Sequence, residues 1–374
     1  MTKQQILHPN GDYREVGLWL ERKGICNVML VCDQSIRFLK INAWFEKLKQ
    51  SQAVKLTVFS DFQPNPLYES VCEGVRLFHE AKCEAVIAVG GGSALDVAKC
   101  IKLFANMEPE SDYLAQKIVP NLIPLMAMPT TAGTGSEATR FAVIYRNGEK
   151  QSIADDSAIP ETVLMDPSAL ITLPAYQKKA TMLDALCHAI ESYWSVNATR
   201  ESVIYSKDAI VQVLRHMDGY FAGTLEGCEG MLWAAHTAGK AINITQTTAG
   251  HAMCYKLTSL YGIAHGHAAA LCVSTLWKHM ILACEPDMKP NGWMPLGNVF
   301  DELAAAMGTG DRLDAAEKFQ CIVDSMQFPE IRAREEDYAL LKRSVNPVRL
   351  KNNPMVLTEE TIDRLYHEIL KETL

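Results

Sequence analysis

The sequence predicts an α/β N-terminal domain with a parallel, Rossmann-like sheet, followed by an all-α domain. Two observations support this fold class. Short apolar runs alternate with helical patterns in the first half of the chain, and strand-like runs become scarce after the segment at 167–174. At 374 residues the chain is long for one hydrophobic core, so two domains are expected. We place the boundary at residue 170, which gives domains 1–170 and 171–374.

Four apolar runs in the first half have the length and flanking residues of buried strands. The segments 36–50 and 67–82 between them carry apolar residues at helical spacing, and this alternation predicts a largely parallel sheet with helices on both faces. A hairpin is predicted over 141–155, where Asn147-Gly148 separates two strand-like runs. The four predicted strands are 27–31, 54–60, 85–89 and 122–128.

Charge and composition favour a small-molecule partner. The net charge of -8 argues against binding to nucleic acid or to an anionic membrane, where basic patches supply most of the attraction. The 11 cysteines form no Cys-x-x-Cys pair, which is typical of small core residues in a reducing compartment. The N-terminal segment lacks the apolar run of a signal peptide, and no window has the apolar length of a membrane span. We therefore expect a cytoplasmic protein.

Three consecutive glycines, Gly90, Gly91 and Gly92, join a predicted strand to a predicted helix in "AVIAVGGGSALDVAK". Glycine lets the backbone approach a ligand closely, and the free N–H groups at a helix start attract phosphate. Ser93 and Asp96 have the spacing of a capping box. The loop therefore fits a pyrophosphate cradle or an ordinary strand-to-helix turn, although it is not the Gly-x-Gly-x-x-Gly fingerprint.

Two further polar segments follow predicted strands. Asp33 stands just past the first strand, where a carboxylate can bond a ribose diol and repel a 2′-phosphate, which favours NAD over NADP. A helix N-cap is the alternative role for Asp33. The loop 128–140, "MPTTAGTGSEATR", offers hydroxyl and backbone donors to a cofactor, or is a plain polar loop at a strand end.

The histidines predict a metal site. Asp184 and His188 lie four residues apart on a predicted amphipathic helix and hence on one face. His251 and His265 belong to a cluster of three histidines within 251–267, where an unpartnered buried imidazole would carry a desolvation cost. One carboxylate and three imidazoles suit a divalent metal such as iron or zinc, with a position left for a substrate oxygen. Any one of these histidines alone could instead be a satisfied core residue.

With the motifs "GGGSALDVAK", "PTTAGTGSE", "DALCHAIESY" and "H…GIAHGHAAAL" in this order, the sequence resembles the iron-containing (group III) alcohol dehydrogenase family over nearly its whole length. The resemblance implies a dehydroquinate synthase-like fold, with NAD(P) in a cleft between the domains and a homodimer or higher homo-oligomer. It implies a metal, Fe2+ or alternatively Zn2+, held by Asp184, His188, His251 and His265. The residues that it implies for cofactor binding are Asp33 at the ribose, Gly90, Gly91, Gly92 and Ser93 at the pyrophosphate, and Asp96, Thr130, Thr131 and Thr134.

The resemblance also implies hydride transfer between a nicotinamide, NAD(H) rather than NADP(H), and a small aldehyde or primary alcohol. Many family members carry a further histidine where this chain has Tyr255, four residues after His251. The Tyr255 hydroxyl could relay a proton through water, or the side chain could be a buried aromatic. His267 is expected to pack or to support the ligands.

For the substrate, stretches such as "EATRFAVIY" and "SVNPVRLKNNP" resemble the phosphonoacetaldehyde reductase branch of this family more than its propanediol or butanol members. A phosphonate dianion needs fixed cationic donors, for which Arg140 is the first candidate and Arg349 and Lys256 are the next. Three alternatives stay open: a dehydroquinate-synthase-like lyase that regenerates its NAD, a reductase of neutral short-chain aldehydes, and a non-catalytic metal-binding protein.

Overall fold

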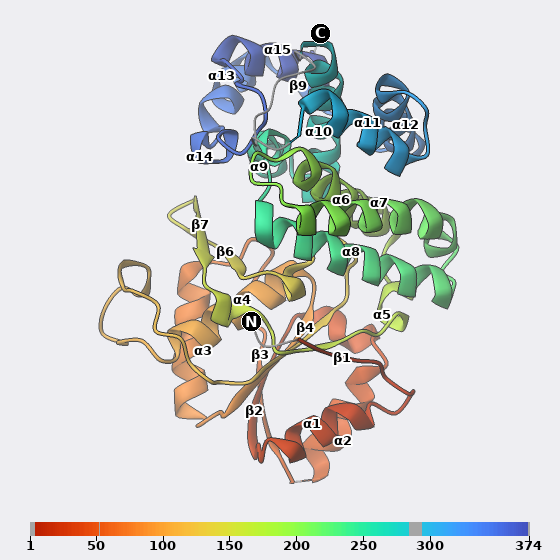
Figure 1. Ribbon diagram of the computed structural model, residues 1–374. Helices are drawn as coiled ribbons and strands as arrows, with labels where there is room; N and C mark the ends of the chain where they lie inside the picture. The colour runs from red at the N-terminus through yellow and green to blue at the C-terminus, as the bar shows by residue number, and fades with distance from the viewer. Residues whose placement is uncertain (1–3, 52, 284–293, 373–374) are drawn as a thin grey trace. The chain divides into compact units, whose positions relative to one another are not determined.

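The computed structural model describes residues 4–51, 53–283 and 294–372, and the chain divides into two compact units (Figure 1). The main change of unit falls between Leu173 and Pro174. Two short segments belong to the unit opposite to their neighbours, so the chain passes between the units more often than a single boundary at residue 170 would require. These segments are Ala132–Thr134, in the helical unit, and Gly223–Leu232, in the α/β unit.

The α/β unit is built on a parallel six-stranded sheet in the order β1-β8-β5-β4-β2-β3, which confirms the predicted fold class. The four predicted strands are the four neighbouring strands of this sheet from β5 to β3. The sequence did not indicate the other two strands, because three residues are too few to show a periodic pattern. The strands are β1 (Gln5–Leu7), β2 (Asn27–Cys32), β3 (Lys55–Phe59), β4 (Ala85–Gly90), β5 (Leu125–Pro129) and β8 (Thr162–Leu164).

Strand β2 shows why helices cover both faces of this sheet. Met29 and Val31 face one apolar core, whereas Val28 and Leu30 face the other, because successive side chains of a strand point to opposite sides. Full burial of one such side chain contributes about 1.5–3 kcal/mol. The first core is shared with α3 (Tyr68–Glu80) and α4 (Gly92–Phe104), and the second with α1 (Arg14–Arg22) and α2 (Ile41–Ser51) (Figure 1).

The predicted hairpin is confirmed as the antiparallel pair β6 (Phe141–Arg146) and β7 (Glu149–Ala154). Asn147 and Gly148 form its turn with φ values of 53° and 77°, the positive values that a tight hairpin turn of this kind requires. The remaining short helices of the α/β unit are η1 (Gln34–Phe38), η2 (Tyr113–Ala115), η3 (Ser136–Ala138), η4 (Asp156–Ala158) and α5 (Ser168–Ile171).

The helical unit is organised around α6 (Ala175–Trp194), which packs against α7 and α10. From Met182 to Trp194 every residue of α6 is buried, as expected of a helix surrounded by others. Helix α8 (Leu225–Thr245) belongs to the α/β unit up to Leu232 and to the helical unit from Trp233. The other elements of the helical unit are α7 (Arg200–Phe221), α9 (Ala249–Tyr261), α10 (His265–Ala283), α11 (Leu296–Met307), α12 (Arg312–Ser325), α13 (Glu335–Ser344), α14 (Pro347–Leu350), α15 (Glu359–Ile369) and the strand pair β9 (Arg332–Ala333) and β10 (Lys371–Glu372).

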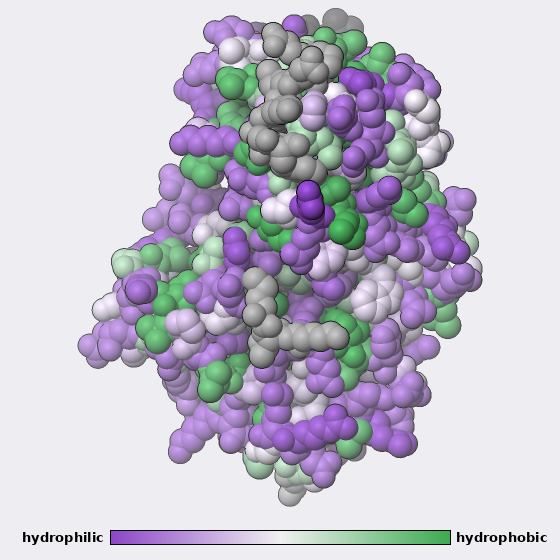
Figure 2. All heavy atoms as spheres, in the orientation of Figure 1, coloured by the Kyte–Doolittle hydropathy of each residue, from purple (hydrophilic) through white to green (hydrophobic). Residues whose placement is uncertain are grey.

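Hydrophilic side chains cover most of the face seen in Figure 2, with apolar residues in scattered places, as on ordinary protein surfaces. The cysteines of the described ranges are all free thiols and mostly buried, as predicted, although Cys26 and Cys321 are exposed. Cys284 lies outside the described residues. None of the helices within the described ranges has the length and apolarity that a membrane crossing requires.

Candidate active site

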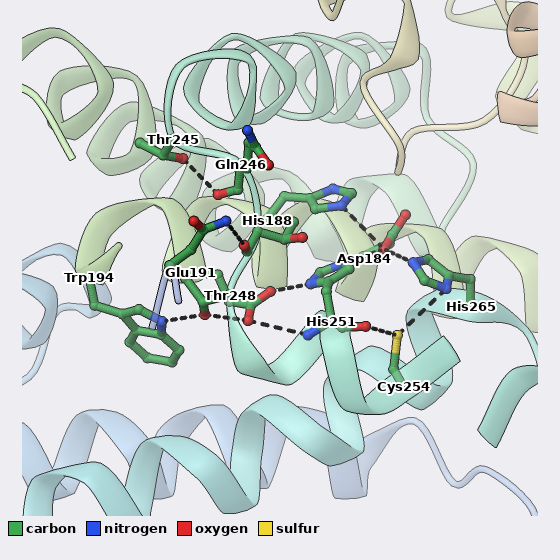
Figure 3. Close-up of polar contacts among 12 residues, drawn as sticks. Asp184, His188, Glu191, Trp194, Thr245, Gln246, Thr248, His251, Cys254 and His265 are labelled. Carbon is green, nitrogen blue, oxygen red and sulfur yellow. Dashed lines mark hydrogen bonds and ion pairs between the residues drawn. The ribbon is translucent and has the colours of Figure 1, made fainter. Parts of the chain in front are cut away.

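Three helices of the helical unit bring the four predicted metal ligands together. Asp184 and His188 lie one turn apart on α6 and are both buried. His251 lies in the first turn of α9, and His265 is the first residue of α10. The side chains of all four point toward one another (Figure 3). The predicted set therefore occupies one place in the structure, with Asp184 at its centre.

The distances between the four side chains are compatible with a bound cation. Asp184 Oδ1 lies 3.8 Å from His188 Nε2, 3.4 Å from His251 Nε2 and 3.9 Å from His265 Nε2. Ligand atoms of the first three residues lie within 4.8 Å of one another. Around a tetrahedral ion with bonds of about 2.0–2.1 Å, ligand atoms lie about 3.3 Å apart, so the observed group needs little adjustment to hold one. The His265 side chain is 35% exposed, which leaves one side of the site accessible.

The protonation states of Asp184 and His188 suit metal ligands. Burial raises the pKa of Asp184, but the neighbouring His188 and His251 outweigh burial and hold that pKa well below its usual range. Burial lowers the pKa of His188 to about 4, so its imidazole is neutral at pH 7. A charged carboxylate beside a neutral imidazole is the protonation state in which both bind a cation. Burial lowers the pKa of His251, but the carboxylates of Glu191 and Asp184 outweigh burial and raise it to about 10, so a cation would have to displace a proton from this imidazole.

A glycine between two histidines allows α10 to start directly against α6. A Cβ atom on Gly266 would lie only 1.9 Å from the Ala180 carbonyl oxygen and 2.7 Å from Asp184 Cβ. No larger residue fits at this contact without moving one of the helices. Gly266 therefore allows the close helix packing that brings His265 next to Asp184.

His267, the third histidine of the cluster, makes structural contacts. Its ring stacks on Phe328 with the ring centroids 3.9 Å apart, and its Nδ1 lies 3.2 Å from the Tyr176 hydroxyl. That hydroxyl accepts a hydrogen bond from the Ala264 N–H, so its own proton is directed to His267 Nδ1. Burial lowers the pKa of His267 to about 4. His267 is thus a neutral packing residue that supports the start of α10.

Tyr255 lies beside the ligand set. Its ring is stacked on the His265 imidazole, with centroids 5.4 Å apart and an angle of 17° between the planes. Tyr255 is half-buried, one turn of α9 after His251. The sequence placed it near the ligands by its spacing from His251, and the structure adds its direct contact with His265.

Sequence reasoning missed Glu191. This residue follows His188 by one turn on α6, is fully buried, and bonds His251 Nδ1 and the Thr248 hydroxyl. The available signal was its position seven residues after Asp184, which puts both carboxylates on one face of a helix that is otherwise apolar there.

The segments predicted for cofactor binding meet at the carboxyl edge of the sheet. Asp33 follows β2, Gly90 ends β4, and Thr130 follows β5, and these three strands are neighbours. The Thr130 N–H donates to the Gly90 carbonyl at 3.0 Å. The chain leaves β2 toward one side of the sheet and β4 toward the other, and such a change of direction is where open α/β sheets bind ligands.

Both roles considered for Asp33 are compatible, because they use different oxygens. Asp33 Oδ1 accepts the Ser35 N–H at 2.7 Å and so caps η1. Asp33 Oδ2 faces the glycine loop, 3.7 Å from where a Cβ atom of Gly90 would be. The second oxygen is therefore the one that a ligand at this edge could reach.

The predicted capping box at Ser93 and Asp96 is wrong. The N-cap of α4 is Gly91, which makes no side-chain cap bond. Asp96 Oδ1 instead accepts from the Ser136 hydroxyl at 2.7 Å, and Oδ2 accepts from the Val143 N–H at 3.0 Å. With both oxygens engaged within the protein, Asp96 is placed to hold the loop after β5 rather than to face a ligand.

Lys99, one turn after Asp96 on α4, also holds the loop after β5. Its buried ammonium donates to the Ser136 hydroxyl and to the carbonyls of Thr139 and Phe141 at 2.9, 2.8 and 2.7 Å. Burial lowers the pKa of Lys99 to about 8. These bonds tie the loop that carries Thr130 and Thr131 to α4. Thr134 belongs to Ala132–Thr134, the segment grouped with the helical unit.

The candidate substrate cations have different surroundings. The Arg140 guanidinium lies 3.7 Å from the Asp156 carboxylate and 5.2 Å from the centre of the Phe141 ring. Arg349 on α14 donates from Nη1 to Gln246 Oε1 at 2.7 Å, just before the start of α9. Lys256 is a half-buried residue of α9.

Comparison with known proteins identifies the family. The model of the iron-containing alcohol dehydrogenases matches residues 3–167, and that of the C-terminal part of the same family matches residues 178–370. The chain belongs to the iron-containing alcohol dehydrogenase family. It is therefore an oxidoreductase by family, and the four converging side chains lie in the part matched by the C-terminal model.

Its relatives act on different small molecules. The NAD-dependent methanol dehydrogenase of Bacillus methanolicus is 28% identical over 96% of both chains. The phosphonoacetaldehyde reductase of Streptomyces viridochromogenes is 29% identical over 80% of both chains. Among solved structures, the sulfoacetaldehyde reductase of Bifidobacterium kashiwanohense in complex with NAD+ superimposes with a TM-score of 0.86 at 26% identity, over 99% of this chain and 97% of the other.

Replacing His265 with alanine should abolish metal retention while leaving the chain folded, because a ligand is lost at a partly exposed position. We expect at least about 100-fold weaker metal affinity, since even residues that only support a ligand contribute 10- to 100-fold. His267→Ala is the matched control, and it should keep the metal while losing thermal stability. Elemental analysis and circular dichroism would measure both effects, and wild-type metal content in His265→Ala would refute the assignment.

Proposed function

We propose that this protein is a metal-dependent NAD(H) aldehyde reductase and alcohol dehydrogenase, acting on a small aldehyde or primary alcohol. The observation that carries the proposal is the convergence of three imidazole Nε2 atoms on Asp184 Oδ1 in a chain of the iron-containing alcohol dehydrogenase family. We further propose a cytoplasmic homodimer or higher homo-oligomer, as the family resemblance implies.

The donor set fits a divalent cation, and we propose Fe2+, with Zn2+ as the alternative. Asp184, His188, His251 and His265 would hold it. When bound, the cation supplies positive charge that polarises a carbonyl group, and the nicotinamide carries the hydride. The remaining chemistry falls to the side chains of this chain.

The α/β unit would hold the cofactor. The N–H groups at the start of α4, after Gly90 and Gly91, would receive the pyrophosphate, and Ser93 would add a hydroxyl. Thr130 and Thr131 would bond the cofactor from the neighbouring loop, with Thr134 further along. The bonds of Asp96 and Lys99 keep that loop in position.

Tyr255 would move the proton. An aldehyde that accepts a hydride must also gain a proton at its oxygen, and a half-buried phenol stacked on His265 can pass one from water. Its hydroxyl would act at the accessible side of the ligand set, where the partly exposed His265 lies.

The direct test is aldehyde-dependent oxidation of NADH after reconstitution with Fe2+ or Zn2+. Net consumption of NADH is expected in proportion to the aldehyde reduced. A dehydroquinate-synthase-like lyase would regenerate its NAD and show no net consumption, whereas a non-catalytic protein would show no turnover.

The Asp33 carboxylate should make the enzyme prefer NADH to NADPH by repelling a 2′-phosphate. Asp33→Asn keeps the cap of η1, because Asn caps as well as Asp, but removes the charge. We expect this variant to narrow the ratio of the two kcat/KM values by about 10-fold without loss of thermal stability. Asp33→Gly should narrow it as well. An unchanged ratio in both variants would show that Asp33 only caps η1.

For the substrate we propose an aldehyde that carries an anionic group, such as phosphonoacetaldehyde. Two of the compared relatives are named for a phosphonate- or a sulfonate-bearing aldehyde. Arg140 stays our first candidate for the anion. Arg349 is its competitor, because a neutral amide holds its guanidinium and no carboxylate of the described ranges pairs with it.

Arg140→Ala should lower kcat/KM for phosphonoacetaldehyde about ten- to a hundred-fold, the value of one charge-assisted contact, with little change for butanal. Arg349→Ala, measured with the same two aldehydes, serves as the control. If kcat/KM for phosphonoacetaldehyde falls in Arg349→Ala and not in Arg140→Ala, then Arg349 on α14 binds the anion. A wild type that prefers butanal or lactaldehyde would contradict the anionic substrate and leave the family activity intact.

A further inference from the structure

The carboxylate of Glu191 has no role in the chemistry above, yet it lies next to the ligand set. Glu191 is 0% exposed, in the part of α6 whose neighbours Ile190 and Trp194 are also buried. A buried charge carries a desolvation cost of several kcal/mol unless hydrogen bonds or an opposite charge compensate it. Packing alone therefore does not explain a carboxylate at position 191.

Among the residues that the structure describes, the hydrogen bonds to this carboxylate come from the start of α9 (Figure 3). Oε1 accepts from the Thr248 hydroxyl at 2.6 Å and from the His251 N–H at 3.3 Å. Oε2 bonds His251 Nδ1. Glu191 therefore contacts both the backbone and the ring of His251, which fixes the position of the residue and the rotation of its imidazole.

Helix α9 lacks the usual side-chain cap at its N-terminus, because the capping residue bonds Glu191 instead. Thr248 is the N-cap of α9 but makes no side-chain cap bond, because its hydroxyl donates to Glu191 instead. The His251 N–H, which a capping threonine would normally satisfy, is bonded by Glu191. Trp194 Nε1 donates to the Thr248 hydroxyl at 2.9 Å and so orients it toward the carboxylate.

The close packing of the start of α9 against Glu191 and Val273 depends on Gly250. A Cβ atom there would lie 2.9 Å from Glu191 Oε1 and 2.5 Å from Val273 Cγ2. A glycine directly before His251 thus lets the helix start approach the carboxylate. The arrangement joins Trp194, Thr248, Glu191 and His251 in one buried network.

We propose that Glu191 is a positioning residue that holds His251 in the tautomer and orientation needed to bind the cation. With Nδ1–H donated to the carboxylate, the lone pair of His251 lies on Nε2, the atom 3.4 Å from Asp184 Oδ1. A carboxylate partner also makes an imidazole a stronger donor to a metal. The corresponding nitrogen of His265, Nδ1, lies 3.6 Å from the Cys254 thiol.

This inference rests on the proposed metal-dependent function, and a measurement without substrate or NADH tests it. The affinity for Zn2+ alone, measured by competition with a chelator, should fall about 10- to 100-fold in Glu191→Ala. Glu191→Gln keeps an oxygen that can accept Nδ1–H but lacks the charge, so its affinity should fall less than that of Glu191→Ala. The metal-free Glu191→Ala protein should unfold below the wild-type temperature, because the Thr248 hydroxyl and the His251 N–H groups lose their acceptor in a buried place.

Glu302→Gln is the matched control. Its carboxylate accepts a hydrogen bond from Tyr193 of α6 at 2.6 Å but contacts no ligand, so the Zn2+ affinity should stay at the wild-type value. If Glu191→Ala does not fold, Glu191→Gln decides the question by a loss of at least about 3-fold. Wild-type Zn2+ affinity in the folded Glu191 variants would overturn the inference. No Zn2+ binding by the wild type would overturn the proposed metal site as well.

Discussion

The packing of α6, α9 and α10 in the helical unit depends on one buried carboxylate, that of Asp184. Its charge lies inside α6 at a position that is 3% exposed, where a lone anion would be strongly disfavoured. Three imidazoles from α6, α9 and α10 compensate it, and they do so only if the starts of α9 and α10 lie directly against α6. The glycines at 250 and 266 permit this contact, and the Glu191 network holds α9 in it. Packing and ligand geometry in this unit are therefore one and the same arrangement.

The α/β unit meets a different requirement, which is to keep a loop of small polar residues rigid at the edge of a sheet. Backbone N–H groups bind an anion well only when they already point toward it. Here the buried Lys99 and Asp96 fasten the loop after β5 to α4, and α4 is itself the helix whose start faces that edge. The cost of burying this lysine and carboxylate is offset by their hydrogen bonds to the loop.

Much of this could be predicted from the sequence because the signals are local. The strands β2 to β5 are apolar runs with clear ends, and Asn147-Gly148 has a strong turn preference, so both were predicted. Asp184 and His188 share a helix face by their spacing. The histidine cluster at 251–267 suggested that His251 and His265 join that pair, and the family resemblance implied the same set, although spacing alone does not bring distant helices together.

The parts that could not be predicted depend on contacts between distant segments. Asp96 has the spacing of a helix cap, but tertiary bonds to Ser136 and Val143 prevail over that local preference. The role of Glu191 could not be predicted, because a single glutamate in a helix is most often on the surface. The three-residue strands β1 and β8 find their place through pairing with each other and with β5.

The claim that the rest depends on is that Asp184 and the three histidines hold one cation together. The most direct measurement is X-ray diffraction from crystals of the iron-reconstituted protein, recorded on both sides of the iron absorption edge. We predict one strong anomalous peak within about 2.0–2.2 Å of Asp184 Oδ1 and of Nε2 of His188, His251 and His265. A peak at other residues, or none in fully reconstituted protein, would contradict the claim.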